Sequence, residues 1–323
     1  METILINLLF CLIGLVGLYF GGEKLVSGSV TIANSLELTP QLIAITIIAL
    51  GTSLPELAVS VSAVLKSSQD IAFGNVVGSN ISNLLCVLGL AAVAAPLYIP
   101  IGSLKLEIFW LLIASSIFTI TAQLFSSITL WGGIVFILLL ALINGHLAYV
   151  SFSRKNGVVT NKLANATKKK EKLVYGLLLV FFGVILLLGS AELVVWSSKK
   201  IAVSLFVPEV FIGLTIIALG TSLPEIAASV VAVRKGYSEI AIGNIIGSNI
   251  FNCLGIIGAS AISSGSSKFV APENLLKFDI MIMLLITIIT GTILLLAKKV
   301  GRFLGVIFLC TYLIYILSSF QQI

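Results

Sequence analysis

Runs of about 20 apolar residues recur from one end of this chain to the other, and they constrain its fold more than any other feature. A run of that length, as a helix, crosses roughly 30 Å of hydrocarbon. Of the 323 residues, 59% are hydrophobic and only 10% are charged, which is too apolar for the surface of a soluble protein. We therefore predict an all-α polytopic membrane protein with ten transmembrane helices, near residues 3–21, 40–64, 71–95, 106–124, 128–150, 173–196, 208–233, 240–262, 276–297 and 302–320.

The chain contains an internal repeat. The segment TIIALGTSLPE occurs at residues 46–56 and again at 215–225, an offset of 169 (215 − 46), and the alignment continues without a gap to GSNxxN motifs further on. We predict a first five-helix repeat at 1–150, a charged linker at 151–172 and a second five-helix repeat at 173–323. Because five is odd, the second repeat enters the membrane inverted, an arrangement typical of secondary transporters. Duplication also builds channels, so a channel stays an alternative.

Lysine and arginine are distributed unevenly between the expected loops. Ten spans place most of them on one side, including those of 154–172, 234–235 and 298–302. The positive-inside rule then predicts a cytoplasmic 151–172 loop and both termini outside the cell membrane. The net charge of +6 is explained by anionic lipid, and no basic patch interleaved with aromatic residues suggests nucleic acid.

The repeated GTSLPE motif places oxygen atoms inside an apolar helix. Ala49, Thr52, Ser53 and Glu56 fall on one helical face because they are three or four residues apart. Pro55 has no N–H to donate and crowds the preceding turn, so we expect the helix to bend or break there. Broken helices in a membrane survive where they line a cavity or find other partners. The motif thus predicts a patch of carbonyl, hydroxyl and carboxylate oxygens.

A second polar motif, GNVVGSNISN, follows at 74–83. Asn75, Ser79 and Asn83 are four residues apart and share a face, while Gly74 and Gly78 permit close approach of another helix. The second repeat contains both motifs again, with Ala218, Thr221, Ser222, Pro224 and Glu225 followed by Asn244, Ser248 and Asn252.

Two carboxylates, Glu56 and Glu225, should meet deep in the membrane where the inverted halves face each other. No lysine or arginine lies at comparable depth in any expected span. Such carboxylates are costly when ionised, and two together need a cation or a shared proton. Oxygen ligands suit hard cations, whereas soft metals prefer Cys or His, which the motifs lack. A site filled by one Ca²⁺ or by two or more Na⁺, but not both, would exchange them.

Enzyme activity is not expected. An intramembrane serine protease would need a serine beside a histidine, but the single histidine, His146, lies at the end of the fifth expected helix. The two aspartates, Asp70 and Asp279, lie near helix ends, and the cysteines form no CxxC pair. Glu23 and Glu192 also repeat at the offset of 169. We interpret them as solvent contacts at helix ends, with a gating role as the alternative.

These motifs resemble the calcium/cation antiporters, and within them the sodium/calcium exchangers of prokaryotic ten-helix type. The family's repeats look like GTSLPE followed by GNxxGSNxxN or GNxxGSNxxD, and both copies in this chain match that pattern. The resemblance covers essentially the whole chain. The resemblance implies antiport of Ca²⁺ against several Na⁺ by alternating access, in which the first and sixth helices slide over a fixed core. It implies no cofactor beyond the transported ions, and we expect a monomer.

The resemblance also implies a ligand set. Glu56 and Glu225 would be the central Ca²⁺ ligands, and the full set is Ala49 (carbonyl), Thr52, Ser53, Glu56, Ser79, Asn83, Ala218 (carbonyl), Thr221, Ser222, Glu225, Ser248 and Asn252. Asn252 replaces the Asp of some relatives, which removes a third carboxylate and argues against potassium co-transport. An H⁺/Ca²⁺ exchanger is the less favoured alternative, and a cation channel is less favoured again.

Overall fold

The structure is a computed structural model that describes residues 2–99, 104–155, 166–205, 218–265, 269–273 and 275–320. The first half contains α1 (Glu2–Leu36), α2 (Pro40–Ile43), η1 (Ala44–Ile48), α3 (Ala49–Thr52), α4 (Leu54–Leu65), α5 (Gln69–Ser82), η2 (Asn83–Val87), α6 (Leu88–Ala94), β1 (Leu97–Tyr98), α7 (Lys105–Phe125), β2 (Ser127–Ile128) and α8 (Leu130–Lys155). Elements labelled η are π-helical turns.

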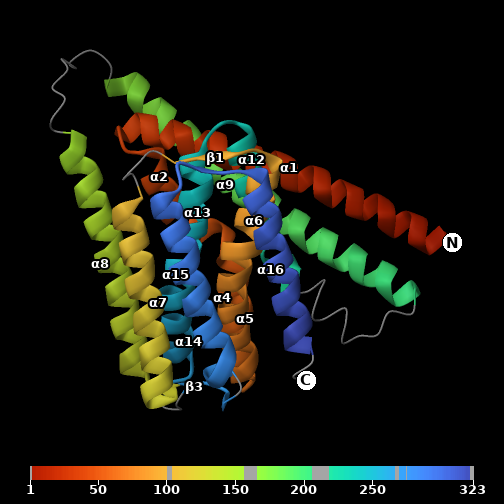
Figure 1. Ribbon diagram of the computed structural model, residues 1–323. Coiled ribbons are helices and arrows are strands. Elements are labelled where there is room, and N and C mark those ends of the chain that lie inside the picture. The colour runs from red at the N-terminus through yellow and green to blue at the C-terminus, as the bar shows by residue number, and fades with distance from the viewer. Residues whose placement is uncertain are drawn as a thin grey trace.

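The second half begins with α9 (Ala166–Ser204) and continues beyond residues 206–217, which lie outside the described part. Its further elements are α11 (Ala218–Thr221), α12 (Leu223–Arg234), α13 (Ser238–Ile250), η4 (Phe251–Ile256), α14 (Ile257–Ser263), β3 (Phe269–Val270), η5 (Leu275–Asp279), α15 (Ile280–Leu296), β4 (Lys299–Val300) and α16 (Arg302–Phe320). Figure 1 shows these helices gathered in one bundle, with α1 and α9 crossing it obliquely.

The bend expected at the GTSLPE proline is confirmed. The segment from Pro40 to Thr52 meets α4 at an angle of 46°, and Ser53 is the single residue between them. Pro55 occupies the first turn of α4, where its missing N–H has no helical partner to lose. In the second copy, Ser222 separates α11 from α12 and Pro224 takes the same place. The start of that copy, within 206–217, lies outside the described residues.

The helices α1 and α9 are longer than the sequence suggested. We expected spans at 3–21 and 173–196, but α1 continues to Leu36 and α9 runs from Ala166 to Ser204. The two helices lie side by side and oblique to the bundle, so each needs more residues to traverse the same thickness. Their contact is close: a Cβ added to Gly28 would lie 2.7 Å from the carbonyl oxygen of Gly176.

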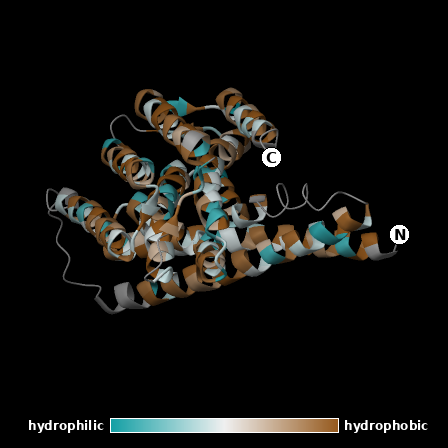
Figure 2. Ribbon diagram, turned by 90° about the horizontal axis from the view of Figure 1, so that it is seen from below, coloured by the Kyte–Doolittle hydropathy of each residue, from teal (hydrophilic) through white to brown (hydrophobic). Residues whose placement is uncertain are grey.

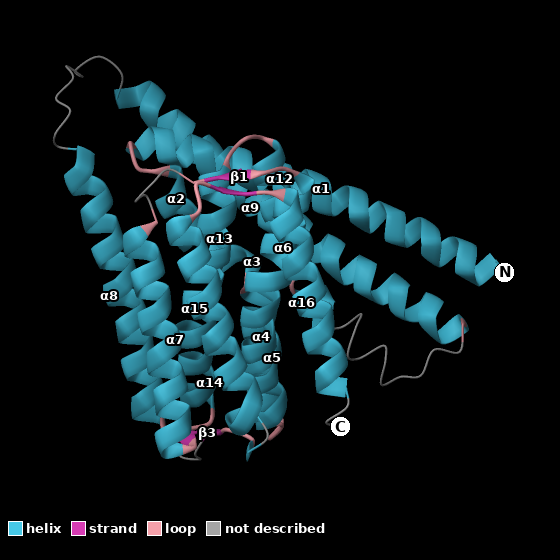
Figure 3. Cartoon of the chain, in the orientation of Figure 1, coloured by secondary structure: helices cyan, strands magenta, loops and turns pink. Residues whose placement is uncertain are grey.

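Two short strand pairs join segments that are distant in sequence. The strand β1 pairs antiparallel with β4, and β2 pairs antiparallel with β3. Figure 3 shows β1 and β3 at opposite ends of the bundle. Each pair therefore places a connection of the first half beside a connection of the second half.

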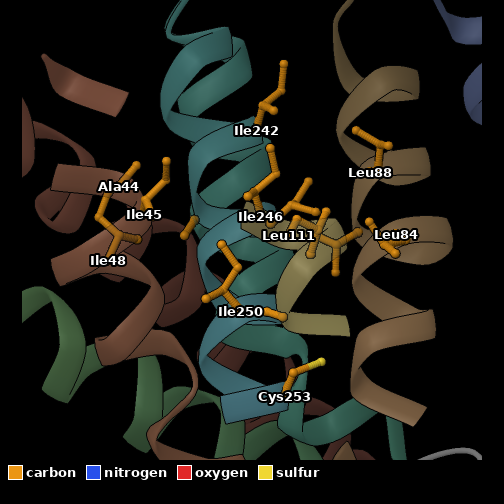
Figure 4. Close-up of a cluster of buried hydrophobic side chains, with 14 of the residues drawn as sticks. Ala44, Ile45, Ile48, Leu84, Leu88, Leu111, Ile242, Ile246, Ile250 and Cys253 are labelled. Carbon is orange, nitrogen blue, oxygen red and sulfur yellow. The ribbon is translucent and has the colours of Figure 1, made fainter. Parts of the chain in front are cut away.

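The centre of the bundle is formed by the two helices that contain the GSNxxN motifs. Of the most apolar stretch in Ser238–Ser263, 94% is buried, and for Gln69–Ala94 the value is 83%, against 22% for α1. Figure 4 shows that α13 packs between η1 on one side and the helix formed by η2 and α6 on the other, through Ile242, Ile246 and Ile250. These helices are therefore mostly buried, and the polar residues of their GSNxxN motifs are at most 5% exposed.

The outer helices present large apolar side chains. Trp131, Leu142 and Phe303 are 74%, 68% and 82% exposed, and the hydrophobic colouring of Figure 2 extends along the outer helices. Among the described residues, six helices are long and apolar enough to cross a membrane, or seven if the bent pair Pro40–Thr52 and Leu54–Leu65 is one span. This surface fits contact with lipid chains.

Candidate cation-binding site

Two buried carboxylates occupy matching positions in the two halves. Glu56 lies in the first turn of α4 and Glu225 in the first turn of α12, and each is only 1% exposed. Both side chains follow a helix break and stand at a helix N-terminus, where the unpaired N–H groups favour negative charge. The break and the proline therefore do more than bend the chain, because they place a carboxylate at the start of a new helix.

The two carboxylates are brought together across the halves. The Ser53 hydroxyl donates a hydrogen bond of 3.0 Å to Oε1 of Glu225, and the Thr221 side chain hydrogen-bonds Glu56 in return. Glu56 and Glu225 lie close enough to interact electrostatically. Among the described residues, no lysine, arginine or histidine forms an ion pair with either carboxylate. The expected convergence of the two GTSLPE copies is thus seen.

A layer of amides and hydroxyls supports the carboxylates from behind. Asn75 Nδ2 donates to the backbone oxygen of Glu56 (3.0 Å) and to Ser60 Oγ (2.9 Å). In the second half Asn244 Nδ2 donates to Ser229 Oγ (3.2 Å). Ser60 and Ser229 were missed in our sequence interpretation, although both are serine at the offset of 169, a signal that would have found them.

Asparagines from the two halves also contact each other. Asn83 Nδ2 donates to Oδ1 of Asn249 (3.1 Å), and Asn249 Nδ2 donates to the backbone oxygen of Asn80 (3.4 Å). Because the Asn83 nitrogen is engaged, its amide oxygen is left to face other partners. Asn80 and Asn249 are a second pair that we did not single out from the sequence.

The buried side-chain oxygens that lack a hydrogen-bond partner within the described residues include six from the predicted ligand set. They are Glu56 Oε2, Asn83 Oδ1, Ser222 Oγ, Glu225 Oε2, Ser248 Oγ and Asn252 Oδ1. An unpartnered buried polar atom costs about 1–3 kcal/mol, so six such oxygens within the predicted ligand set need an explanation. Oxygen atoms with free lone pairs around two carboxylates are the donor set of a hard cation.

Ala49 and Thr52 of the predicted ligand set lie directly before the helix break at Ser53. The Ala49 carbonyl begins α3 and accepts from Ser53 N (3.0 Å) and Thr52 Oγ1 (3.4 Å), and Thr52 Oγ1 also reaches Asn244 Oδ1 (3.2 Å). Ser79 is 5% exposed in α5. Ala218 begins α11, but its side chain lies outside the description.

The close helix approach expected at the motif glycines is described for the second repeat only. A Cβ on Gly247 would lie 2.3 Å from the Ile45 carbonyl oxygen, and one on Gly243 would lie 3.0 Å from the Gln41 carbonyl oxygen. These contacts bring α13 against η1, directly before Ala49. For Gly74 and Gly78 the corresponding partners at the offset of 169 fall within residues 206–217, outside the described chain, so close approach there stays a prediction.

Other polar residues from the sequence lie elsewhere. His146 accepts a hydrogen bond from Trp110 Nε1 (3.1 Å) on the outer helices. Among the described residues no cluster of three or more His, Cys, Asp or Glu could hold a metal ion. Glu23 and Glu192 were expected at helix ends, and this was wrong: both lie well inside α1 and α9, because those helices are longer than expected.

Ser53→Ala is expected to weaken Ca²⁺ binding about tenfold, because the hydroxyl both orients Glu225 and belongs to the proposed ligand set; a hydrogen bond to a charged group contributes about 1.5–3 kcal/mol. Equilibrium binding of ⁴⁵Ca²⁺ to the purified protein measures the change. Ser62→Ala, within the helix α4 that Ser53 precedes, is the matched control and should leave the affinity as it is. An unchanged affinity in Ser53→Ala would separate this residue from the site.

Fold and site together define a polytopic helical membrane protein with a buried, oxygen-lined site between its halves. A model of the sodium/calcium exchanger protein family matches residues 6–147 and 175–321. The chain belongs to this family, within the calcium/cation antiporter superfamily, and is a membrane antiporter.

Similar proteins span most or nearly all of its length. The sodium/calcium exchanger MaX1 of Methanosarcina acetivorans is 30% identical over 352 residues, covering 98% of this chain and 99% of that protein. The inner membrane protein YrbG of Escherichia coli is 32% identical over 288 residues, covering 86% and 85%. The sodium-calcium exchanger NCX_Mj soaked with 10 mM Na⁺ and zero Ca²⁺ superposes with a TM-score of 0.82 at 29% identity, covering 98% and 99%.

Proposed function

We propose that the protein exchanges Na⁺ for Ca²⁺ across the cell membrane by alternating access, with both cations competing for the site between the two GTSLPE/GSNxxN copies. The observation that supports this best is the pair of buried carboxylates, Glu56 and Glu225, which form no ion pair among the described residues, together with the unpartnered buried oxygens of the predicted ligand set. One Ca²⁺ neutralises both carboxylates, and Na⁺ ions that also use the neutral oxygens do the same.

The strand pairs support the topology of ten spans in two inverted repeats. With both termini outside, the connections that hold β1 and β4 are both cytoplasmic, and those that hold β2 and β3 are both outside. The pairing of β1 with β4 and of β2 with β3 therefore agrees with this topology. The pattern is also what a two-fold relation between the halves 1–150 and 173–323 requires, since it exchanges the two pairs. The 151–172 linker would then face the cytoplasm.

Na⁺ rather than H⁺ is the coupling ion in this proposal. In this proposal buried hydroxyl and amide oxygens without a hydrogen-bond partner, such as those of Ser222, Ser248 and Asn252, complete the coordination of the ion, and they add ligands that a Na⁺ ion needs and a proton does not. Asn252 stands where some relatives have Asp, so the proposed site holds no third carboxylate. We propose that the ligand set named from the sequence is the transported-ion site and that the protein works as a monomer.

The coupling is tested with ⁴⁵Ca²⁺ uptake into proteoliposomes loaded with Na⁺ and diluted into choline buffer. We expect rapid uptake that needs internal Na⁺ and does not depend on K⁺. Vesicles without internal Na⁺ but with an imposed pH gradient are the comparison. Uptake driven there by the pH gradient would replace the proposal with H⁺/Ca²⁺ exchange, and uptake that follows voltage alone would indicate a channel.

A further inference from the structure

The two halves do not pack identically against the oblique helices α1 and α9. The helix α1 lies along α12, close enough that a Cβ on Gly22 would be 3.1 Å from the carbonyl oxygen of Ala227. The equivalent contact would join α9 to α4, and in the described structure those two helices touch marginally at most. The α1–α9 pair is therefore displaced toward the α12 side of the core.

An ion pair joins the helices on that side. Lys235 Nζ lies 2.8 Å from Glu23 Oε1 and also donates to Ser27 Oγ at 3.2 Å. The Lys235 and Glu23 side chains are 30% and 35% exposed, so the pair lies at the boundary of the packed interior. Lys235 directly follows α12, whose first turn contains Glu225. One helix of 12 residues thus has a proposed cation ligand at one end and this ion pair at the other.

Both members of the pair recur at the offset of 169. Glu192 corresponds to Glu23, and Lys66, directly after α4, corresponds to Lys235. Yet within the described chain neither Glu192 nor Lys66 forms an ion pair. The sequence thus contains two equivalent Glu–Lys pairs, and the structure forms one of them.

We propose that Glu23–Lys235 and Glu192–Lys66 are alternative latches, one for each access state of the exchanger. In a transporter built from inverted repeats, exchanging the conformations of the two halves produces the opposite-facing state. The contact made by Glu23 and Lys235 in one state is then made by Glu192 and Lys66 in the other. On the proposed topology Lys235 is cytoplasmic, so the pair in this structure holds the cytoplasmic side of α1 against α12.

This inference rests on the proposed alternating access but not on the identity of the ions. An ion pair at this exposure is weak and changes an equilibrium constant by only a factor of a few. A weak latch suits a transporter, because each state must be released in every cycle. Its loss should therefore change the ratio of the two states without unfolding the protein.

The test measures the distance distribution between spin labels on α1 and on the core, in the full chain in lipid nanodiscs. Labels at Tyr19→Cys and Leu313→Cys, in a background with Cys11 and Cys310 replaced by Ala, report the position of α1; both sites are exposed, at 48% and 59%. We expect Glu23→Gln to shift the ratio of the two distances about two- to fivefold away from the α12-bound arrangement. The charge-exchanged double variant E23K/K235E should restore the ratio.

Two further variants test the direction in which the ratio of the two distances should change. Glu192→Gln should move the ratio the opposite way, toward the α12-bound arrangement, since its latch forms in the other state. Lys24→Gln, next along α1 and outside the pair, is the matched control and should have no effect. The proposal is overturned if Glu23→Gln leaves the ratio as in the wild type, if E23K/K235E fails to restore it, or if Glu192→Gln leaves it unchanged or shifts it in the same direction as Glu23→Gln. Because no transport is measured, a protein that moves a different ion would still give these results.

Discussion

Glu225→Gln is expected to abolish Na⁺-driven Ca²⁺ uptake and to lower Ca²⁺ affinity by roughly 100-fold or more. The substitution keeps the shape of the side chain and removes one of the two charges that face the proposed ion. Losing one partner of a buried charge interaction costs about 3–5 kcal/mol, which is at least a factor of 100 in affinity. Glu56→Gln should behave in the same way, because Glu56 occupies the equivalent place in α4.

The control for this experiment is Glu239→Gln, the same chemical change in the first turn of α13 and outside the oxygen cluster. Its uptake and affinity should match the wild type. Wild-type uptake in Glu225→Gln would show that Ca²⁺ does not depend on this carboxylate. Correct folding of each variant is checked by its elution as a single species in detergent.

Gly247→Ala is expected to cause the second largest loss, although alanine adds only one methyl group. Its Cβ would lie 2.3 Å from the carbonyl oxygen of Ile45 and 2.8 Å from Ala49 Cβ, so the backbone of η1 and α3 must move. Overpacking of this kind costs about 1–3 kcal/mol. The displaced segment includes Ala49, a proposed ligand, so we expect both a lower unfolding temperature and a loss of ⁴⁵Ca²⁺ uptake.

Gly145→Ala provides the matched comparison, since an added Cβ there meets nothing within 4 Å. Replacing an exposed helical glycine by alanine stabilises a helix slightly, so this variant should be at least as stable as the wild type. If Gly247→Ala had the stability and uptake of Gly145→Ala, the close packing of α13 on η1 would not be needed for the site.

The helix break and the meeting of the two carboxylates were predictable because both features repeat in the sequence. A proline after Ser53, a carboxylate at Glu56 and a second copy at the offset of 169 indicate a helix break and a meeting of charges without any coordinates. The same reasoning applied to Ser60 and Asn80 would have found the supporting layer. We passed over them because a single serine or asparagine in a membrane helix commonly has a local role.

Other features depend on tertiary packing and leave no local signal. The π-helical turn η1 ends just before Ala49, and the π-helical turn η2 begins at Asn83, so each turn helps to orient a proposed ligand. Their sequences, AITII and NLLCV, nevertheless resemble those of ordinary α-helix. The length of α1 was missed because Glu23 and Lys24 resemble a helix end at a membrane surface. In the structure Glu23 is matched by Lys235 from a distant segment, and the oblique path of α1 accommodates the extra turns.

The most direct test of the account is equilibrium ⁴⁵Ca²⁺ binding to the purified protein during a Na⁺ titration at constant ionic strength. If the two carboxylates and their neighbouring oxygens form one shared cation site, Na⁺ must displace Ca²⁺ with a dependence steeper than one ion for one ion, while K⁺ or choline must not. Glu56→Gln and Glu225→Gln must each remove the displaceable Ca²⁺. Bound Ca²⁺ that stays constant as Na⁺ rises would contradict the account, because the two ions would then occupy separate sites.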